Sequence, residues 1–124
     1  MRVRWTLVVA WTVAMLMAFG YVSSAALKLA GEADTVIQFQ AWGYGTRFMI
    51  AIGFIELLGG LALLIPRYAP YAAFFLSLEM IGAIYTHLST GIGSPFHAVR
   101  ALILLTTLAW IRRPAWTRRQ VSRD

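Results

Sequence analysis

The sequence has no cysteine among its 124 residues. A disulfide relay, a thiolate nucleophile and a cysteine-ligated metal are therefore excluded within this chain. Charge is also scarce, because only 13% of the residues are charged and only five are acidic. The sequence contains no H-E-x-x-H motif, P-loop, dinucleotide-binding fingerprint or G-x-S-x-G motif. These absences remove the enzyme classes most easily recognised from sequence, and no metal site is predicted.

Hydrophobic residues, in contrast, make up 60% of the chain, and its mean hydropathy is +0.69. A soluble protein of this size cannot bury that much apolar surface. About 20 apolar residues cross the roughly 30 Å of hydrocarbon in a bilayer, with ~17 as a working minimum. The sequence therefore predicts an all-α, four-transmembrane-helix antiparallel bundle. Its spans are expected at about 5–27, 48–65, 71–88 and 96–111, the last being marginal in length.

The breaks between these segments differ in character. Pro66 and Pro70 predict a tight turn, with the second and third helices forming an antiparallel hairpin. The connection from Gly31 to Thr46 is the longest and most polar, and its aromatic residues are typical of a segment at the membrane interface. We expect one membrane domain, 1–113, followed by a basic cytoplasmic tail, 114–124.

The net charge is +6, and the basic residues gather near the two ends of the chain. This distribution predicts a lipid bilayer rather than a nucleic acid as the partner, with both ends on the cytoplasmic side. The expected location is a bacterial cytoplasmic (inner) membrane. An alternative is a signal peptide cleaved near Ser23-Ser24-Ala25, which would leave three spans. The first apolar stretch is, however, longer than the usual signal segment of about 7–15 residues.

Two acids interrupt the apolar segments. At ~1.5 Å per residue, Glu56 and Glu79 lie roughly 12–13 Å from the nearer boundary. A carboxylate at that depth costs several kcal/mol unless it is protonated, paired or turned into the bundle. Small residues share a face with each acid, which predicts that both acids point inward. Those residues are Gly53 and Gly60 around Glu56, and Ala72, Gly82, Ala83 and Thr86 around Glu79.

Basic and hydroxyl side chains near the outer end complete a predicted outward-facing polar pocket. Two carboxyl groups at similar depth can also share a proton. Alternatives stay open: Lys28 and Arg47 can extend to the interface, Glu56 can be a structural pin, and His97 can be interfacial. The candidate catalytic residues are Glu56, His87 and Glu79, and the candidate ligand-binding residues are Lys28, Arg100, Tyr21, Ser24 and Tyr85.

Several stretches resemble the DoxX-like family of small four-helix integral membrane proteins. They are AALKLAG at the end of the first helix, FIELLGGLALLIPR with the following YAP, and MIGAIYTHLSTG closing the third helix. The resemblance covers roughly residues 5 to 112 and implies that the family's recurring polar residues fall on Lys28, Glu56 and His87. It also implies an association with quinone-linked redox complexes, thiosulfate oxidation or oxidative-stress assemblies. Cysteine-dependent redox chemistry, present in some relatives, has no counterpart in this sequence.

The leading functional hypothesis is a pocket for a small lipophilic molecule such as a quinone, in or beside a membrane oxidoreductase complex. Lys28 and Arg100 would orient its polar headgroup, and Glu56 and His87 would exchange protons with it. A homo-oligomer is compatible with the sequence. Haem is not favoured, because both histidines would lie near one surface and no Cys-x-x-Cys-His attachment motif occurs.

Two alternatives belong to other classes. The protein can be a non-catalytic membrane scaffold or assembly factor whose polar cluster holds the helices in register. It can also be an acid/base enzyme, an isomerase or hydrolase, that uses Glu56 and Glu79 on a hydrophobic epoxide or carbonyl compound.

Overall fold

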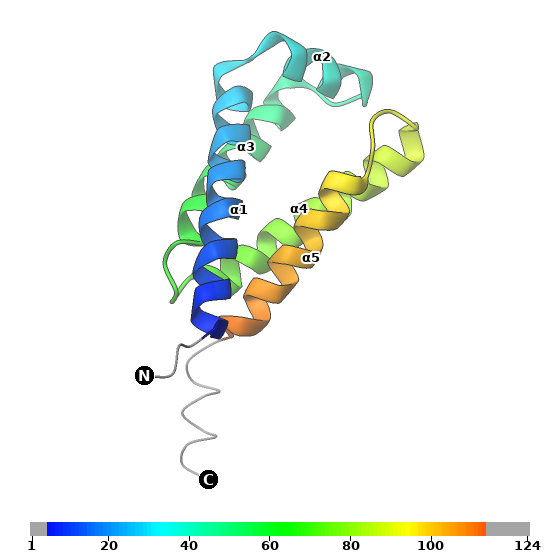
Figure 1. Cartoon of the computed structure of the whole chain (residues 1–124). Helices are drawn as coiled ribbons and strands as arrows, with labels where there is room; N and C mark the ends of the chain where they lie inside the picture. Colours follow the sequence, from blue (N-terminus) through cyan, green and yellow to red (C-terminus); the bar gives the residue numbers. More distant parts are fainter. Residues whose placement is uncertain (1–4, 114–124) are drawn as a thin grey trace.

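A computed structural model describes residues 5–113, and all the regular secondary structure within this range is helical (Figure 1). The predicted all-α class is confirmed. The described residues form five helices: α1 Trp5–Ala30, α2 Ala33–Ala41, α3 Thr46–Ala62, α4 Ala69–Thr90 and α5 Phe96–Ile111.

Helix ends fall where the sequence supplies residues suited to stopping or starting a helix. Gly31 and Gly91 follow α1 and α4 with φ angles of 69° and 68°, a left-handed conformation that glycine adopts without a steric penalty. Pro70 lies in the first turn of α4, where a missing amide hydrogen costs nothing. The predicted boundaries are therefore close to the observed ones, although α3 ends at Ala62, three residues early.

The polar connection between α1 and α3 contains a helix of its own, α2. The Glu32 side chain caps α2 by accepting hydrogen bonds from the backbone amides of Asp34 and Thr35 and from the Thr35 hydroxyl. These bonds, led by the one from the Thr35 hydroxyl, hold the pKa of the Glu32 carboxyl below its ordinary value. α2 lies across one end of the molecule, above the ends of the longer helices (Figure 1).

The four longer helices associate as two antiparallel pairs, α1 with α3 and α4 with α5 (Figure 1). Glycine makes the first pair close. A Cβ atom added to Gly60 would lie 3.0 Å from the Cβ of Tyr21, and one added to Gly53 would lie 3.1 Å from the Cβ of Lys28. α3 and α4, which were predicted to form an antiparallel hairpin, contact each other, but neither is the main packing partner of the other. Residues 63–68 join them, but they diverge from the turn because each packs mainly against another helix.

The two pairs meet at the end where α1 begins and α5 ends. Their contact is a core that includes Ala10, Ala14, Leu76, Leu105 and Leu108. Small residues on α1 and leucines on the other pair let the backbones approach there. Toward α2 the pairs separate, and a Cβ added to Gly82 of α4 would meet nothing within 4 Å. α4 therefore makes no close helix contact at Gly82.

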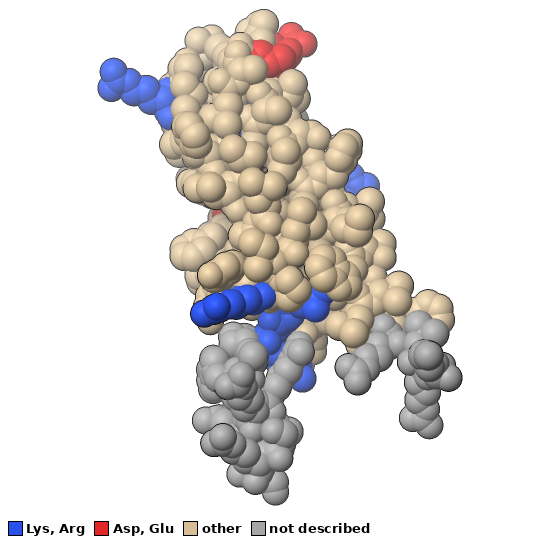
Figure 2. All heavy atoms as spheres, turned by 90° about the vertical axis from the view of Figure 1, so that its left-hand side faces the viewer, with Lys and Arg blue, Asp and Glu red and all other residues tan. Residues whose placement is uncertain are grey.

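The outer surface is largely apolar. The middle of the face formed by α1 and α3 is almost wholly free of charged side chains, which gather toward the two ends (Figure 2).

Among the described residues, α1 and α4 are each long and apolar enough to cross a membrane. α2 and α3 meet these criteria of length and hydropathy only when taken together, and the chain bends by 114° between them. If this bent pair counts as one span, the described residues contain up to three candidate spans. α5, with 16 residues, is apolar but shorter. The four-span arrangement stays a prediction, and the proposed basic tail, 114–124, lies outside the described residues.

Candidate functional site

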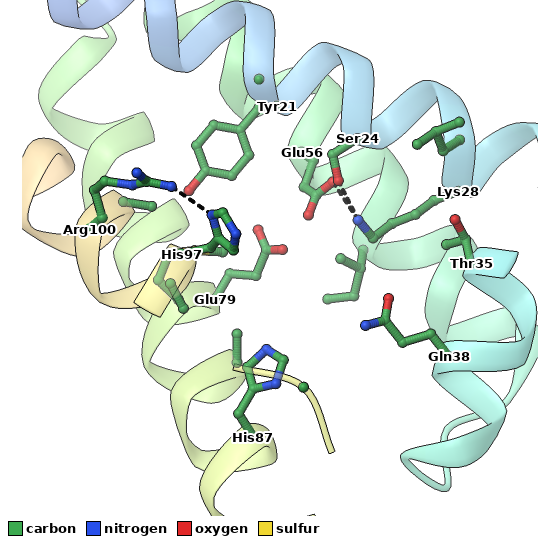
Figure 3. A pocket seen from close by; sticks show the side chains of 18 of the residues that line it. Tyr21, Ser24, Lys28, Thr35, Gln38, Glu56, Glu79, His87, His97 and Arg100 are labelled. Carbon is green, nitrogen blue, oxygen red and sulfur yellow. Dashed lines mark hydrogen bonds and ion pairs between the residues drawn. The ribbon is translucent and has the colours of Figure 1, made fainter. Parts of the chain in front are cut away.

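A cavity of about 710 Å³ lies where the two helix pairs separate, and residues of all five helices line it. We call it the main cavity. Figure 3 shows polar side chains from α1, α2, α3, α4 and α5 around one space. Seven of the eight predicted site residues line it: Tyr21, Ser24, Lys28, Glu56, Glu79, His87 and Arg100. The exception is Tyr85, which is 71% exposed and lies on another face of α4.

An ion pair between α1 and α3 forms one wall of the main cavity. The Lys28 Nζ atom lies 3.0 Å from Glu56 Oε2 and also donates a hydrogen bond to the Ser24 hydroxyl. The two charged side chains are only 12% and 5% exposed. Lys28 therefore turns inward to Glu56 rather than outward from the bundle. The pair bridges two helices, so the alternative of Glu56 as a structural pin keeps a direct physical basis.

Two buried polar atoms near this pair have no hydrogen-bond partner among the described residues. They are the Tyr21 hydroxyl oxygen on α1 and the Glu79 Oε2 atom on α4. Both side chains point toward the space that Glu56 also faces (Figure 3). Buried polar groups in proteins are nearly always hydrogen-bonded, because an unsatisfied one costs about 1–3 kcal/mol. Two such atoms in one cavity therefore mark where a polar group of a bound molecule would be stabilised.

The first turn of α5 supplies a second basic group. Arg100 Nη2 donates to His97 Nδ1 over 2.7 Å, and because guanidinium only donates, the ring proton of His97 belongs on Nε2. Both side chains line the main cavity (Figure 3). The sequence left His97 as an interfacial residue, and its spacing of three from Arg100 on the helix is the signal that links the two.

His87 has a structural contact that the sequence did not indicate. Its Nδ1 atom lies 2.9 Å from the Ile92 carbonyl oxygen, which also accepts a hydrogen bond of 3.2 Å from Trp42 Nε1. The His87 and Trp42 rings meet edge to face with centroids 5.2 Å apart. Beside them, the hydroxyls of Tyr44 and Thr86 are 2.6 Å apart. We call these five residues the upper contact, because they join the end of α2 to the end of α4.

The contribution of α2 to the cavity was not predicted from the sequence. Its residues Thr35, Gln38 and Phe39 line the main cavity, as does Trp42 directly after it. The signal was present as polar and aromatic residues at helical spacing, but nothing in the pattern showed which way they would face.

Comparison with known proteins agrees with this architecture. The model of the DoxX-like family matches residues 12–111. The chain belongs to the DoxX-like family. This confirms the resemblance found in the sequence, and membership of this DoxX-like family together with the apolar helices fits an integral membrane protein. No curated protein and no solved structure matched the chain.

The chemistry available in the main cavity of this DoxX-like protein is hydrogen bonding and proton exchange. Lys28 and Arg100 supply cationic donors, Tyr21 supplies a hydroxyl, and Glu56 and Glu79 supply carboxyl groups. Among residues 5–113, no group of three or more His, Asp or Glu side chains is arranged to hold a metal ion.

Proposed function

We propose that the protein crosses a bacterial cytoplasmic membrane four times, with both chain ends on the cytoplasmic side. Four spans require the two shorter helices, α3 and α5, to cross the bilayer as well. α3 and α5 have 17 and 16 residues, so each extends about 24–26 Å at ~1.5 Å per residue, and a modest local thinning of the bilayer accommodates the difference. In this orientation the main cavity lies toward the outer leaflet, beneath α2.

We propose further that the main cavity binds a small lipophilic molecule of the quinone type, in or beside a membrane oxidoreductase complex. The observation that carries this proposal is the pair of unpartnered buried atoms, Tyr21 Oη and Glu79 Oε2, in a cavity with largely apolar walls. The volume of about 710 Å³ lies within the roughly 300–1,000 Å³ usual for small-molecule sites.

The polar groups suit the two oxygens of a quinone ring. A carbonyl oxygen accepts hydrogen bonds from Tyr21 and from a cationic donor such as Arg100. Reduction of a quinone to a quinol takes up two electrons and two protons. The partner complex would supply the electrons, and water would supply the two protons. The Glu79 carboxyl group would pass them to the ring oxygens, while Glu56 stays ionised in its pair with Lys28. The role of Glu79 as a proton donor is part of the proposal.

Tyr21→Phe tests the proposal, because it separates binding from folding. The protein would be placed in lipid nanodiscs and titrated with a benzoquinone that carries one isoprene unit. Removing a buried hydroxyl that has no protein partner should leave the free energy of unfolding unchanged or slightly higher. The affinity for the quinone should fall about threefold to tenfold, as expected for one lost hydrogen bond of about 0.5–1.5 kcal/mol.

Tyr71→Phe is the matched control, because the Tyr71 side chain lies on the outer face of the same bundle. It should change neither property. A wild-type protein that binds no quinone, or a Tyr21→Phe variant with unchanged affinity, would contradict the proposal.

The two other candidates each have one observation in their favour. The buried Lys28–Glu56 pair suits a scaffold, for which Glu56→Gln should lower stability and leave any ligand binding intact. The facing carboxyl groups of Glu56 and Glu79 suit an acid/base enzyme, which would turn over an epoxide or carbonyl substrate without an electron donor.

A further inference from the structure

A second, smaller cavity adjoins the main one. It has a volume of about 190 Å³ and lies between α3 and α4, below the upper contact. We call it the side cavity. Glu79 and His87 line both cavities, so the two are direct neighbours. Because 190 Å³ is below the range for a complete small-molecule site, the side cavity suits part of a molecule rather than a whole one.

Each cavity has exposed lining residues, which indicate where it reaches the surface. The main cavity opens between α1 and α5, where its lining residues Leu16 and Leu27 are 66% and 50% exposed. The side cavity opens between α3 and α4, where its lining residues Phe48 and Gly82 are exposed. A molecule with a polar end in the main cavity therefore has two routes by which the rest of it can reach lipid.

The linings of the two routes differ in chemistry. Arg100 and His97 stand beside the opening between α1 and α5, and a cationic border favours water or polar groups. The side cavity has no lysine or arginine in its lining, and four aromatic rings surround it. These are Phe39, Trp42, Tyr44 and Phe48, of which Tyr44 and Phe48 lie 4.7 Å apart between centroids.

We propose that the side cavity holds the apolar chain of the ligand and guides it into the lipid between α3 and α4. This inference rests on the proposed function and specifies the class of ligand: an amphiphile with a ring-sized polar head and a long, flexible hydrocarbon chain. When the hydrocarbon chain of the ligand moves from lipid into the side cavity, it exchanges one apolar environment for another, so hydrophobic transfer contributes little to the free energy of binding. The side cavity instead contributes contact with the aromatic rings and space for the hydrocarbon chain. Binding of a long-chain ligand is therefore sensitive to steric blockage.

Two glycines provide a matched pair of blocking variants. Gly82 lines the side cavity, Gly20 lines the main cavity, and a Cβ added to either meets nothing within 4 Å. Gly82→Phe would fill the route between α3 and α4, and Gly20→Phe would fill the route between α1 and α5. Both substitutions replace an exposed helical glycine, so neither should impair folding.

The experiment measures dissociation constants in nanodiscs for two probes with the same benzoquinone ring, one with a single isoprene unit and one with a saturated ten-carbon chain. In Gly82→Phe, the dissociation constant of the long-chain probe should rise about tenfold, as expected for steric overpacking, while that of the short-chain probe changes less than about twofold. In Gly20→Phe, the ratio of the two constants should match that of wild type. Comparing ratios between variants cancels the greater partitioning of the long-chain probe into lipid.

The possible failures are distinguishable. If both probes bind wild type but Gly20→Phe, rather than Gly82→Phe, selectively weakens the long-chain probe, the chain leaves between α1 and α5 and the side-cavity assignment is wrong. If neither variant alters the ratio, the assignment is also wrong, although the proposed function stands. If neither probe binds wild type, the proposed function fails and the chain assignment fails with it.

Discussion

The two ends of the helical bundle are built from the same elements but are held together differently. Where α1 begins and α5 ends, apolar side chains from both helix pairs form a closed core. Toward α2, the same pairs separate around the main cavity, and their connections are polar: the Lys28–Glu56 pair within one helix pair and the upper contact between them. Dense packing thus closes one end of the bundle, while the polar end keeps an internal space.

Membrane proteins gain no hydrophobic energy from packing apolar helices against each other rather than against lipid. The closed end is therefore stabilised by close contact, and the open end by groups that lipid cannot solvate. A change in one region should consequently alter stability by a different mechanism from a change in the other.

Breaking the buried ion pair should have the largest effect on stability. Glu56→Leu leaves the Lys28 ammonium group without its partner, and the free energy of unfolding in detergent should fall by about 3 kcal/mol. Adding Lys28→Met to that variant should restore most of the loss, because two apolar side chains then replace two charges. Reversible unfolding of both variants measures this, and a double variant as unstable as the single one would contradict a pairwise cause.

A cavity at the closed end should come next. Leu105 is fully buried in the core where the pairs meet, and Leu105→Ala should lower the free energy of unfolding by about 2 kcal/mol. Ile103 lies on the same helix but is 61% exposed, so Ile103→Ala is the control and should cost less than about 0.5 kcal/mol. Equal losses in the same unfolding assay would show that the closed core is no more important than the lipid-facing surface.

Opening the upper contact should have a smaller effect on stability. Tyr44→Phe removes the hydroxyl that lies 2.6 Å from the Thr86 hydroxyl and should cost about 1 kcal/mol. The distance between spin labels at the ends of α2 and α4 should become more broadly distributed. Tyr85→Phe, on the exposed face of α4, should leave the distance distribution as in wild type. An unchanged distribution in Tyr44→Phe would mean that this bond does not hold the two ends together.

The smallest expected effect concerns the cap of α2 and depends on pH. The folded-state pKa of Glu32 is lowered below its ordinary value of about 4.5 by the bonds from Thr35. The ionised Glu32 side chain therefore stabilises α2 above pH 4.5, and this stabilisation is lost as the pH falls through the lowered pKa. Amide exchange protection in α2, corrected for the intrinsic rate, should decline at acidic pH in wild type. Glu32→Gln should show no such pH dependence of protection.

The sequence predicted the helical class, the approximate helix bounds and most of the polar residues around the cavity. Those predictions succeeded because a carboxyl group in an apolar helix, such as Glu56 with Gly53 and Gly60 on its face, has few physical solutions. The pairing of the helices was not predictable in this way. A short turn such as that at Pro66 places two helices next to each other in the sequence. Contacts between segments far apart in the sequence decide which helices pack together.

The same limit explains Tyr85 and α2. Tyr85 lies two residues from His87, so the two side chains leave the helix about 200° apart, and only one can face the cavity. For α2, the sequence indicated an interfacial segment but contained no signal for its position over the cavity. That position depends on Trp42 and Tyr44 meeting α4 more than 40 residues away along the chain.

The central claim is that the open end of the bundle is a binding site for a lipophilic ring. Photo-crosslinking tests it most directly: the protein in nanodiscs is irradiated with an azido-substituted benzoquinone, and the labelled peptides are identified by mass spectrometry. Labels should fall on cavity-lining segments around Tyr21 and Glu79 and should disappear when excess unlabelled quinone is present. Labels confined to the lipid-facing Phe74 and Phe75, or labels that excess quinone does not displace, would contradict the claim.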